Sequence, residues 1–354
     1  MTLTLTEPAL LRQPRAVTPR WIALGVAIWL AVTLLAVVLV VYGVGPLIEQ
    51  RAQTSALSEY RAEIRHAAAE AEGLAGVEVP TQAPAAGSPV AIIDIGGIHL
   101  EQVVVEGVGP QQTRGGPGHV PGTAAPGQPG NSAIVGRRTA FGGPFRRIGR
   151  LERGDEILVT TTQGQTVYVV TTVVSAPVAD APASAPVTTT TTTAPPDTAA
   201  DAAAGDAATD GAADATTATT VRARTRFELP EDGLTTEEVY GPTPDDRLTL
   251  VTSASSWPWA TSRATIVVAR MSSRPFAPTP QGGRTGDDDG RGADGGAAAP
   301  LALAFGAYLV AMGVAIVLYR WARPRSAYLL TAPPLAAAIL LTAEAIARLF
   351  PAWM

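Results

Sequence analysis

A strand-like run in the second half of the chain ends at a small hydroxyl residue. The run reads "RLTLVTS" and stops at Ser253. A serine hydroxyl becomes an effective nucleophile only when an adjacent base removes its proton. The chain contains no cysteine, which excludes a thiolate nucleophile, a disulfide framework and a thiolate metal site. Covalent chemistry at this strand end therefore depends on a base that the fold brings to Ser253.

Bases and metal ligands are few in this sequence. The histidines are scattered without the H-x-x-x-H spacing of a zinc site: His66, His99 and His119. The acidic run at residues 287–289 lacks the spaced ligands of a calcium loop, so we interpret it as part of a solvated linker. We expect no metal ion and no other cofactor.

Composition places part of the chain in a membrane. The 354 residues have a mean hydropathy of +0.18 and only 16% of them are charged, which is unusual for a soluble protein. The net charge of -5 and the lack of a basic cluster interleaved with aromatic residues argue against a nucleic-acid partner. The lipid bilayer is therefore the first expected partner.

Three apolar segments are predicted to span the membrane. Residues 21–42 and 300–319 carry no charge and are long enough to cross a hydrocarbon core of roughly 30 Å. Residues 327–349 form a weaker third span, because two consecutive prolines and Glu344 lie within them. The first apolar run is longer than a signal-peptide core and no clear cleavage site follows, which favours an uncleaved anchor over a cleaved signal.

Flanking arginines predict the orientation. They precede the first span and fill the turn between the second and third: Arg12, Arg15, Arg20, Arg320, Arg323 and Arg325. Since cytoplasmic loops are enriched in Lys and Arg, both places are predicted to be cytoplasmic. Residues 1–20 then form a cytoplasmic tail, and residues 44–299 lie on the extracytoplasmic side of a multi-pass protein of the cell membrane.

The external region divides by composition. Residues 44–87 combine helix formers, a terminating glycine and a Pro/Ala-rich stretch, which predicts a helical stalk followed by a linker. Residues 88–271 hold the strand-like runs, and a Thr/Ala/Asp-rich insertion within them, at 179–220, is predicted to be disordered. Residues 272–299 are predicted to be a flexible linker to the second span.

Strand chemistry dominates the region between the stalk and the second span. Its β-branched runs are "VAIIDIGGIHLEQVVVEGV", "NSAIVG", "DEILVTTTQGQTVYVVTTVV", "RLTLVTS" and "ATIVVARM". No long helical stretch separates these runs, which favours an all-β barrel or sandwich over βαβ units. The glycine-containing turn in "EILVTTTQGQTVYVV" predicts a β-hairpin.

Three linked motifs resemble the bacterial sortase domain, of the kind common in actinobacteria. They are "IHLEQVVVEGV", "GPGHVPGTAAPGQPGNSAIVGRRTAFGGPFRRIGRLERGDEILV" and "YGPTPDDRLTLVTS", and the resemblance covers residues 88–175 and 238–271. It implies an all-β fold, an eight-stranded β-barrel outside the membrane that is flanked by transmembrane helices. Sortases are membrane-anchored cysteine transpeptidases that cut a sorting signal on a secreted protein and attach it to the cell wall or a pilus.

The resemblance also places the family's catalytic positions on this sequence. The histidine position falls on Arg137 in "AIVGRRTAFGGPF", and the cysteine position falls on Ser253. Arg263 in "SRATIVVAR" is the candidate for the family's arginine, although it lies one residue too early. A slip of one residue on a strand turns a side chain to the other face. The chain thus resembles a divergent sortase that lacks the catalytic Cys and His.

The replaced histidine leaves the activation of Ser253 open. An arginine stays protonated near neutral pH, so Arg137 cannot take the hydroxyl proton. His119 in "GPGHVPGT" is the candidate for an alternative base in the sortase-like stretch. We favour a sortase-like pseudoenzyme of the cell envelope. An active transpeptidase or hydrolase that uses Ser253 is the first alternative, and a purely structural envelope protein is the second.

The pseudoenzyme hypothesis implies a binding or scaffolding role. Its expected partners are a sorting-signal peptide, a cell-wall component or an active partner sortase. The candidate ligand-binding residues are Arg137 and Arg138, in a local basic patch, and Trp257 and Trp259, which follow the nucleophile position. The alternative roles of these residues are a solvated face for the arginines and a cap on the barrel end for the tryptophans.

Overall fold

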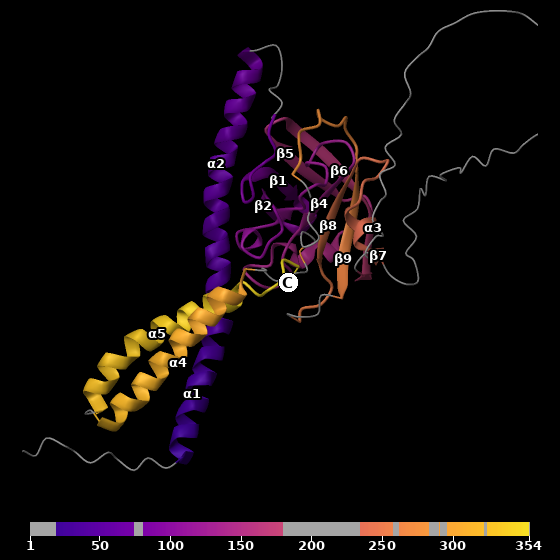
Figure 1. The fold of residues 1–354 in the computed structure, drawn as a ribbon. Coiled ribbons are helices and arrows are strands. Elements are labelled where there is room, and N and C mark those ends of the chain that lie inside the picture. Colours follow the sequence, from indigo (N-terminus) through magenta and orange to yellow (C-terminus); the bar gives the residue numbers. More distant parts are fainter. Residues whose placement is uncertain are drawn as a thin grey trace, which may run out of the picture.

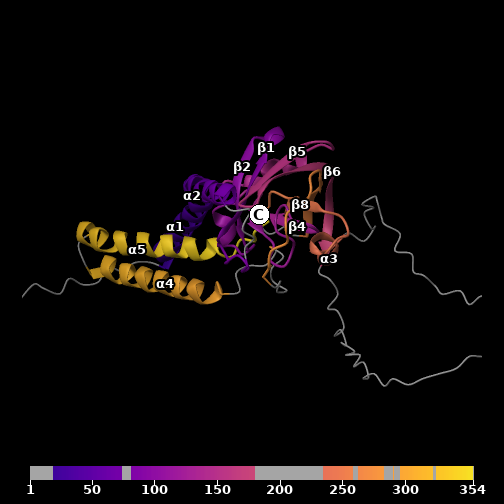
Figure 2. The ribbon, with the colours of Figure 1, turned by 90° about the horizontal axis from the view of Figure 1, so that it is seen from above.

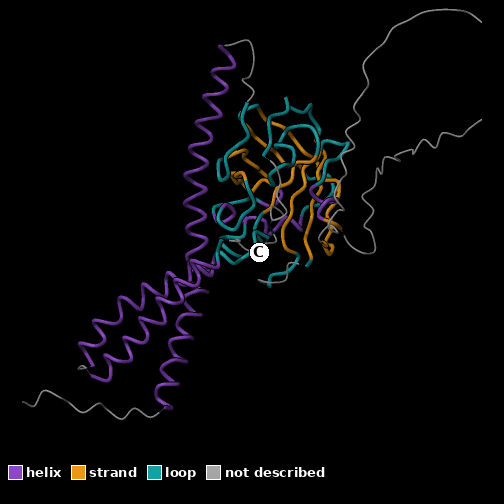
Figure 3. Tube along the Cα trace, viewed as in Figure 1, coloured by secondary structure: helices purple, strands orange, loops and turns teal. Residues whose placement is uncertain are grey.

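A β-barrel and a set of long helices lie side by side in the computed structural model (Figure 1 and Figure 3). The structure describes residues 19–73, 81–179, 234–257, 262–282, 290, 296–321 and 324–353. The predicted insertion at 179–220 lies outside the described residues except for Ala179, the last residue of strand β6.

Eight strands form a closed barrel. They are β1 (Pro89–Ile95), β2 (Leu100–Glu106), β3 (Gly118–His119), β4 (Asn131–Val135), β5 (Glu156–Thr161), β6 (Gly164–Ala179), β8 (Arg247–Ser253) and β9 (Arg263–Met271). The strand order is β5-β1-β2-β3-β4-β8-β9-β6, and β5 also pairs with β6, which closes the sheet. Closure removes the free edges whose N–H and C=O groups would lack partners. The predicted eight-stranded all-β barrel is confirmed.

Strand β6 is the element that closes the barrel. Its first half forms the predicted hairpin with β5, and from Tyr168 onward it pairs antiparallel with β9. The strand pairs β2–β3 and β4–β8 are parallel. A short strand, β7 (Leu234–Thr235), pairs with the end of β6 and leads into helix α3 (Thr236–Tyr240). A capping box between Thr235 and Glu238 begins this helix.

Three short 3₁₀ helices connect the strands. They are η2 (Gly96–Ile98), η3 (Gln112–Arg114) and η4 (Pro144–Arg150). Helix η4 closes one end of the barrel with Phe145 and Ile148, both fully buried. The residue after β4 must be small here, because a Cβ on Gly136 would lie 2.5 Å from the Phe145 ring.

The barrel interior is apolar. Side chains along each strand alternate between this interior and the outer face of the barrel. Successive side chains of a strand point to opposite faces, so Leu248 and Leu250 of β8 fill the interior while Val251 joins a separate cluster outside the barrel. Each buried aliphatic side chain stabilises the fold by roughly 1.5–3 kcal/mol. This interior does not include Ser253, so the barrel does not depend on the chemistry of that site.

The first span and the predicted stalk form one continuous helix. Helix α1 (Pro19–Val38) passes through a π-helical turn (Leu39–Val44) into helix α2 (Gly45–Gly73). Such π-turns insert a residue into the helical ladder and occur frequently at functional sites. This turn lies where the barrel meets the helices, since the Val41 carbonyl accepts a hydrogen bond from Phe141 N–H at 3.3 Å.

Helix α2 packs along the side of the barrel (Figure 1). Its Tyr60 is buried against Ile92 and Val103, and the Tyr60 hydroxyl donates to the Val90 carbonyl at 2.7 Å. Gln53 makes both main-chain hydrogen bonds that Val103 offers: Nε2 donates to the carbonyl at 3.1 Å and Oε1 accepts from the N–H at 2.7 Å. The predicted stalk is therefore a helix that is docked on strand β2.

Two further helices, α4 (Ala298–Trp321) and α5 (Pro324–Ala347), run side by side and project away from the barrel (Figure 2). Pro333 and Pro334 lie inside α5 without ending it. The described part of the chain includes three helices long and apolar enough to cross a membrane, within Ala27–Glu70, Ala298–Leu318 and Leu330–Ala347.

The predicted linker after β9 begins with residues that are held to the barrel. Phe276 N–H donates to the Gly127 carbonyl at 2.8 Å, and Thr279 N–H donates to Gln128 Oε1 at 2.9 Å. Residues 272–282 therefore follow the barrel surface before the chain continues toward α4.

We expect Gln53→Ala to loosen helix α2 from the barrel. The change leaves the N–H and C=O of Val103 without their side-chain partner, which costs about 1–3 kcal/mol when the groups stay buried. Amide hydrogen exchange at Val103, measured on the full chain in detergent, should become faster. Gln50→Ala is the matched control because Gln50 is exposed on the same helix; equal protection of Val103 in both variants would contradict this docking.

Candidate functional site

Ser253 is the last residue of β8 and lies beside β9. Its main chain pairs with Ala264, and its side chain is on the outer face, as is that of Val251 two residues earlier. The buried Ser253 hydroxyl donates to the Ser255 carbonyl at 3.0 Å and accepts from the Ser255 N–H at 3.1 Å. These two bonds use the hydroxyl to shape the turn after β8. A carbonyl oxygen is too weak a base to remove the hydroxyl proton.

Arg137 follows β4 and is fully buried. Each of its nitrogens donates to a main-chain carbonyl: Nε to Thr113 (3.1 Å), Nη1 to Pro351 (3.1 Å) and Nη2 to Pro110 (2.9 Å). Burial, and after it the positive charge of Arg114, lowers the pKa of Arg137 to about 9. With this pKa the guanidinium is still cationic near neutral pH, so Arg137 is a donor to carbonyls and not a base for Ser253.

The loop after Arg137 connects Arg137 to the long helices through contacts of Phe141 and Arg114. The guanidinium carbons of Arg114 and Arg137 both lie 5.0 Å from the centroid of the Phe141 ring, which is the geometry of cation–π contacts. Phe141 has a left-handed φ of 50°, and such a conformation persists in a bulky residue only when its surroundings impose it. Arg114 in turn forms a bidentate ion pair with Glu344 of α5, in which Nη2 donates to Oε2 at 3.1 Å.

The segment after α5 occupies the outer face beside Ser253. The Trp353 carbonyl accepts hydrogen bonds from the N–H of Ser253 (3.0 Å), the N–H of Arg138 (3.3 Å) and the hydroxyl of Thr252 (3.3 Å). Together with the Arg137 bond to Pro351, these contacts hold the main chain of residues 351–353 in place. We call this set of donors and the apolar side chains around the indole the Trp353 site.

The apolar part of the Trp353 site lies on the outer face of the barrel. Trp353 is fully buried in a cluster with Ala352 and with side chains from five strands, α3 and two loops: Val108, Val120, Ala133, Val135, Ala176, Val178, Leu234, Val239, Tyr240, Val251, Ala264, Ile266 and Val268. Gly290 packs directly against the indole, since a Cβ there would lie 3.0 Å from Trp353 Nε1. The indole thus fills the apolar surface that borders Ser253.

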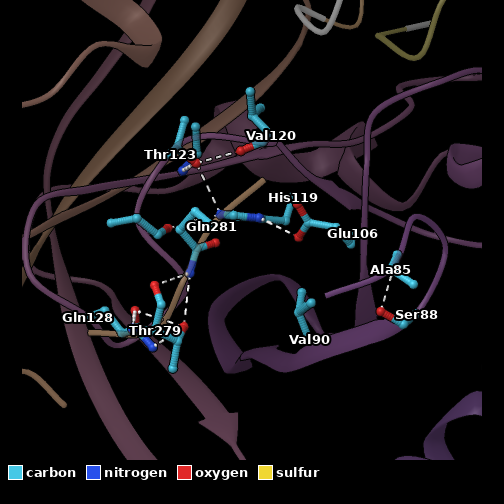
Figure 4. Close-up of polar contacts among 12 residues, drawn as sticks. Ala85, Ser88, Val90, Glu106, His119, Val120, Thr123, Gln128, Thr279 and Gln281 are labelled. Carbon is cyan, nitrogen blue, oxygen red and sulfur yellow. Dashed lines mark hydrogen bonds and ion pairs between the residues drawn. The ribbon is translucent and has the colours of Figure 1, made fainter. Parts of the chain in front are cut away.

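His119, the alternative base, is engaged elsewhere. Its Nδ1 lies 2.8 Å from Glu106 Oε2, and its Nε2 lies 2.9 Å from the Ala124 carbonyl and 3.0 Å from Thr123 Oγ1 (Figure 4). The histidine sits on β3, and β4 separates that strand from β8. In the described part of the chain, both ring nitrogens of His119 therefore contact Glu106, Thr123 and Ala124 and not Ser253.

Arg263, the candidate for the family's arginine, and Arg138, a candidate ligand-binding residue, differ in whether they contact Ser253. Arg263 lies on the opposite strand face, because Ser253 pairs with the next residue, Ala264, and its exposed side chain donates to the Ser175 carbonyl at 3.1 Å. Arg138 does contact the nucleophile position, since its Nη1 donates to the Ser253 carbonyl at 3.2 Å. The structure thus brings Arg137, Arg138 and Ser253 together.

The tryptophan candidates do not line the Trp353 site in the described residues. The side chain of Trp257 is 66% exposed, and its N–H donates to Ser255 Oγ at 3.0 Å. Trp259 lies outside the described residues. The tryptophan next to Ser253 is instead Trp353, whose carbonyl accepts from the Ser253 N–H and whose indole is buried in the neighbouring apolar cluster; sequence reasoning missed this residue. A tryptophan and a proline just after an apolar segment are typical of a membrane-interface anchor, so the pattern did not indicate contact with β8.

A separate pocket of about 270 Å³ lies between α2 and the turn of the β5–β6 hairpin. Its lining includes Tyr60, Val90, Gln128, Gln163 and Thr279. The Gln128 amide holds one wall by donating to both Gln163 and Thr279, and Figure 4 shows the Thr279 contact. None of the site residues predicted from the sequence lines this pocket.

Comparison with known proteins identifies a protein family that matches this chain. The family model of the sortase domain matches residues 93–272, which is half of the chain. A comparison with curated proteins found no match.

Solved sortase structures are among the similar folds. A sortase D5 transpeptidase from Clostridium perfringens is 20% identical with a TM-score of 0.39, and the match covers 63% of this chain and 99% of that one. Sortase E from Streptomyces avermitilis is 24% identical with a TM-score of 0.32, covering 54% and 93%. Sortase E1 from Streptomyces coelicolor, solved with a tripeptide in the active site, is 22% identical with a TM-score of 0.33, covering 55% and 94%.

We expect Arg137→Lys to destabilise the protein despite the conserved charge. A lysine ammonium is a point donor on a flexible chain and cannot reproduce a fork that reaches three carbonyls. Loss of two charged hydrogen bonds should lower the free energy of unfolding by about 3 kcal/mol. Chemical denaturation of the purified chain in detergent measures this loss. Arg150→Lys, at an exposed position of the same loop region, is the control, and equal midpoints would refute the role of the guanidinium fork.

Proposed function

Because the chain belongs to the sortase family, we propose that it is a membrane-anchored envelope protein that binds or scaffolds peptides without catalysing transpeptidation. The observation that carries the proposal is the state of Arg137. Arg137 is at the position that we assign to the family's histidine. It is a buried cation, and each of its nitrogens donates a hydrogen bond to a main-chain carbonyl. Acyl transfer needs a nucleophile and a base that acts on it, whereas peptide binding needs donors and an apolar surface.

The donors beside Ser253 support a peptide ligand. Two N–H groups and one hydroxyl converge on a single carbonyl oxygen, that of Trp353, and Arg137 holds the carbonyl of Pro351. Main-chain carbonyls are common to every peptide, so this donor set suits a sorting-signal peptide or the peptide part of a cell-wall component. An active partner sortase that presents such a peptide is the third partner we propose.

An active serine hydrolase or transpeptidase is the alternative function. The observation that favours it is that the Ser253 N–H binds a carbonyl oxygen next to the Ser253 hydroxyl, which is how an oxyanion hole is arranged. We place this function second because Arg137, at the position that we assign to the family's histidine, cannot take the hydroxyl proton. A purely structural role, in which Trp353 permanently fills the site, is the remaining alternative.

The arrangement of the helices supports a barrel on the extracytoplasmic side. Helix α1 ends at the barrel and α5 also ends there, while the end of α4 and the start of α5 lie together far from the barrel (Figure 1). In the sequence, the predicted cytoplasmic arginines adjoin the start of α1, the end of α4 and the start of α5. We therefore propose a multi-pass protein of the cell membrane with its barrel outside.

Single-cysteine labelling tests this orientation. The natural chain has no cysteine, so each variant carries one thiol. A membrane-impermeant maleimide should label Arg150→Cys in intact cells, because Arg150 is exposed on the barrel, and should label Arg20→Cys only after permeabilisation. The reverse pattern would place the barrel in the cytoplasm.

We expect no transpeptidation or hydrolysis of sorting-signal peptides by the full chain in detergent. Ser253→Ala should be indistinguishable from the natural protein, because Arg137, at the position that we assign to the family's histidine, is a cation and cannot take the hydroxyl proton. An active cysteine sortase on the same peptides is the positive control. Turnover by the natural chain that is lost in Ser253→Ala would overturn the proposal and identify serine as the nucleophile. Absence of both turnover and peptide binding would favour the structural role.

A further inference from the structure

We propose that the Trp353 site is a peptide-binding site and that residues 349–353 are its resident ligand, held in cis and displaced by a peptide that carries an aromatic residue at the position of Trp353. The inference rests on the proposed function and gives it a ligand class and a competitor. The observations that carry it are the hydrogen bonds to the main chain of this segment, the burial of its indole and its attachment to α5.

Another peptide can bind at the Trp353 site because the site recognises main-chain atoms. The donors from Arg137, Arg138, Thr252 and Ser253 all end on carbonyl oxygens of the segment and none on a side chain. Hydrogen bonds of this kind fix the direction and depth of a peptide but do not select its sequence. A second peptide can therefore make the same bonds once residues 351–353 have left.

Selectivity comes from the place that the indole fills. Trp353 is fully buried among small and β-branched side chains of β4, β8 and β9, with Gly290 against its Nε1 edge. A buried aromatic side chain surrounded by near-neutral contacts is the usual anchor of an interface. Pro351 and Ala352 precede it, so the segment offers a rigid turn, a small residue and then the anchor.

The resident segment is tethered to the membrane helix at its other end. Arg114 pairs with Glu344 three residues before the end of α5, and Phe350 packs against Phe141 and Val41. A tether of this length keeps the segment at an effective concentration on the order of millimolar beside its site. If the segment alone binds with a Kd of about 0.1 mM, a competing peptide meets an apparent Kd raised about tenfold.

Peptide binding to two tryptophan variants tests the inference. The probe is a fluorescein-labelled pentapeptide, Leu-Phe-Pro-Ala-Trp, which has the sequence of residues 349–353, and its binding to the full chain in nanodiscs is followed by fluorescence anisotropy. We expect Trp353→Ala to bind the probe up to about tenfold more tightly than the natural chain, because the competing segment has lost its anchor. Trp257→Ala is the matched control because that indole is 66% exposed, and it should bind as the natural chain does.

A second probe and a second variant keep the result interpretable. The peptide Leu-Phe-Pro-Ala-Ala should bind Trp353→Ala at least about tenfold more weakly than the first probe, since it lacks the anchor. Trp353→Phe, which retains a buried ring if Trp353→Ala fails to fold, should show an intermediate gain. In the natural chain, a saturating concentration of the first probe should leave the Ser253 amide protected from hydrogen exchange, because one carbonyl replaces another.

Equal probe binding by all variants would overturn the inference, because the peptide would then bind away from the Trp353 site. Absence of probe binding in folded Trp353→Ala and Trp353→Phe would also overturn it and would make residues 349–353 a permanent structural plug. These outcomes are distinct from failure of the proposed function, which is read from turnover of sorting-signal peptides. The variants could gain pentapeptide binding and still show no affinity for sorting-signal peptides. That result would support residues 349–353 as the resident ligand and would reject sorting-signal peptides as the partner.

Discussion

The buried cation of Arg137 is the constraint on which the rest of the site depends. Removing a guanidinium from water costs several kcal/mol, and the cost is offset only when its donors find acceptors in good geometry. The acceptors here come from two places in the chain, the loop that carries Pro110 and Thr113 and the segment that carries Pro351. Arg137 therefore depends on acceptors from both segments, which connects the region after α5 to the barrel.

The barrel is held together independently of this region. The apolar interior stabilises the barrel, and neither Arg137 nor Ser253 belongs to it. The Ser253 N–H and the Arg137 guanidinium both donate to main-chain carbonyls of the segment after α5. Under the proposed function, the region contributes this capacity to hold a peptide main chain, and Arg137 is a donor and not a base.

The same contacts couple the barrel to the membrane helices. The Phe141 ring lies under the guanidinium groups of Arg114 and Arg137, its N–H reaches the π-helical turn, and Arg114 reaches Glu344 on α5. Occupancy of the Trp353 site and the packing of α5 are therefore parts of one contiguous network. If a peptide replaces the segment after α5, as we propose, it changes the contacts that anchor α5 to the barrel.

Elements with a local signal can be predicted from the sequence. Alternating β-branched runs identify the long strands, and uncharged runs identify the helices able to cross a membrane. The linked motifs also indicate the sortase family, and the resemblance predicts that its catalytic positions fall on Arg137 and Ser253. What surrounds these two residues is visible only in the folded structure. Trp353 lies a hundred residues beyond Ser253, and a tryptophan after an apolar helix has the same local pattern whether it faces lipid or protein. Its burial depends on long-range packing and on carbonyl groups, which every residue carries and which leave no mark in the sequence.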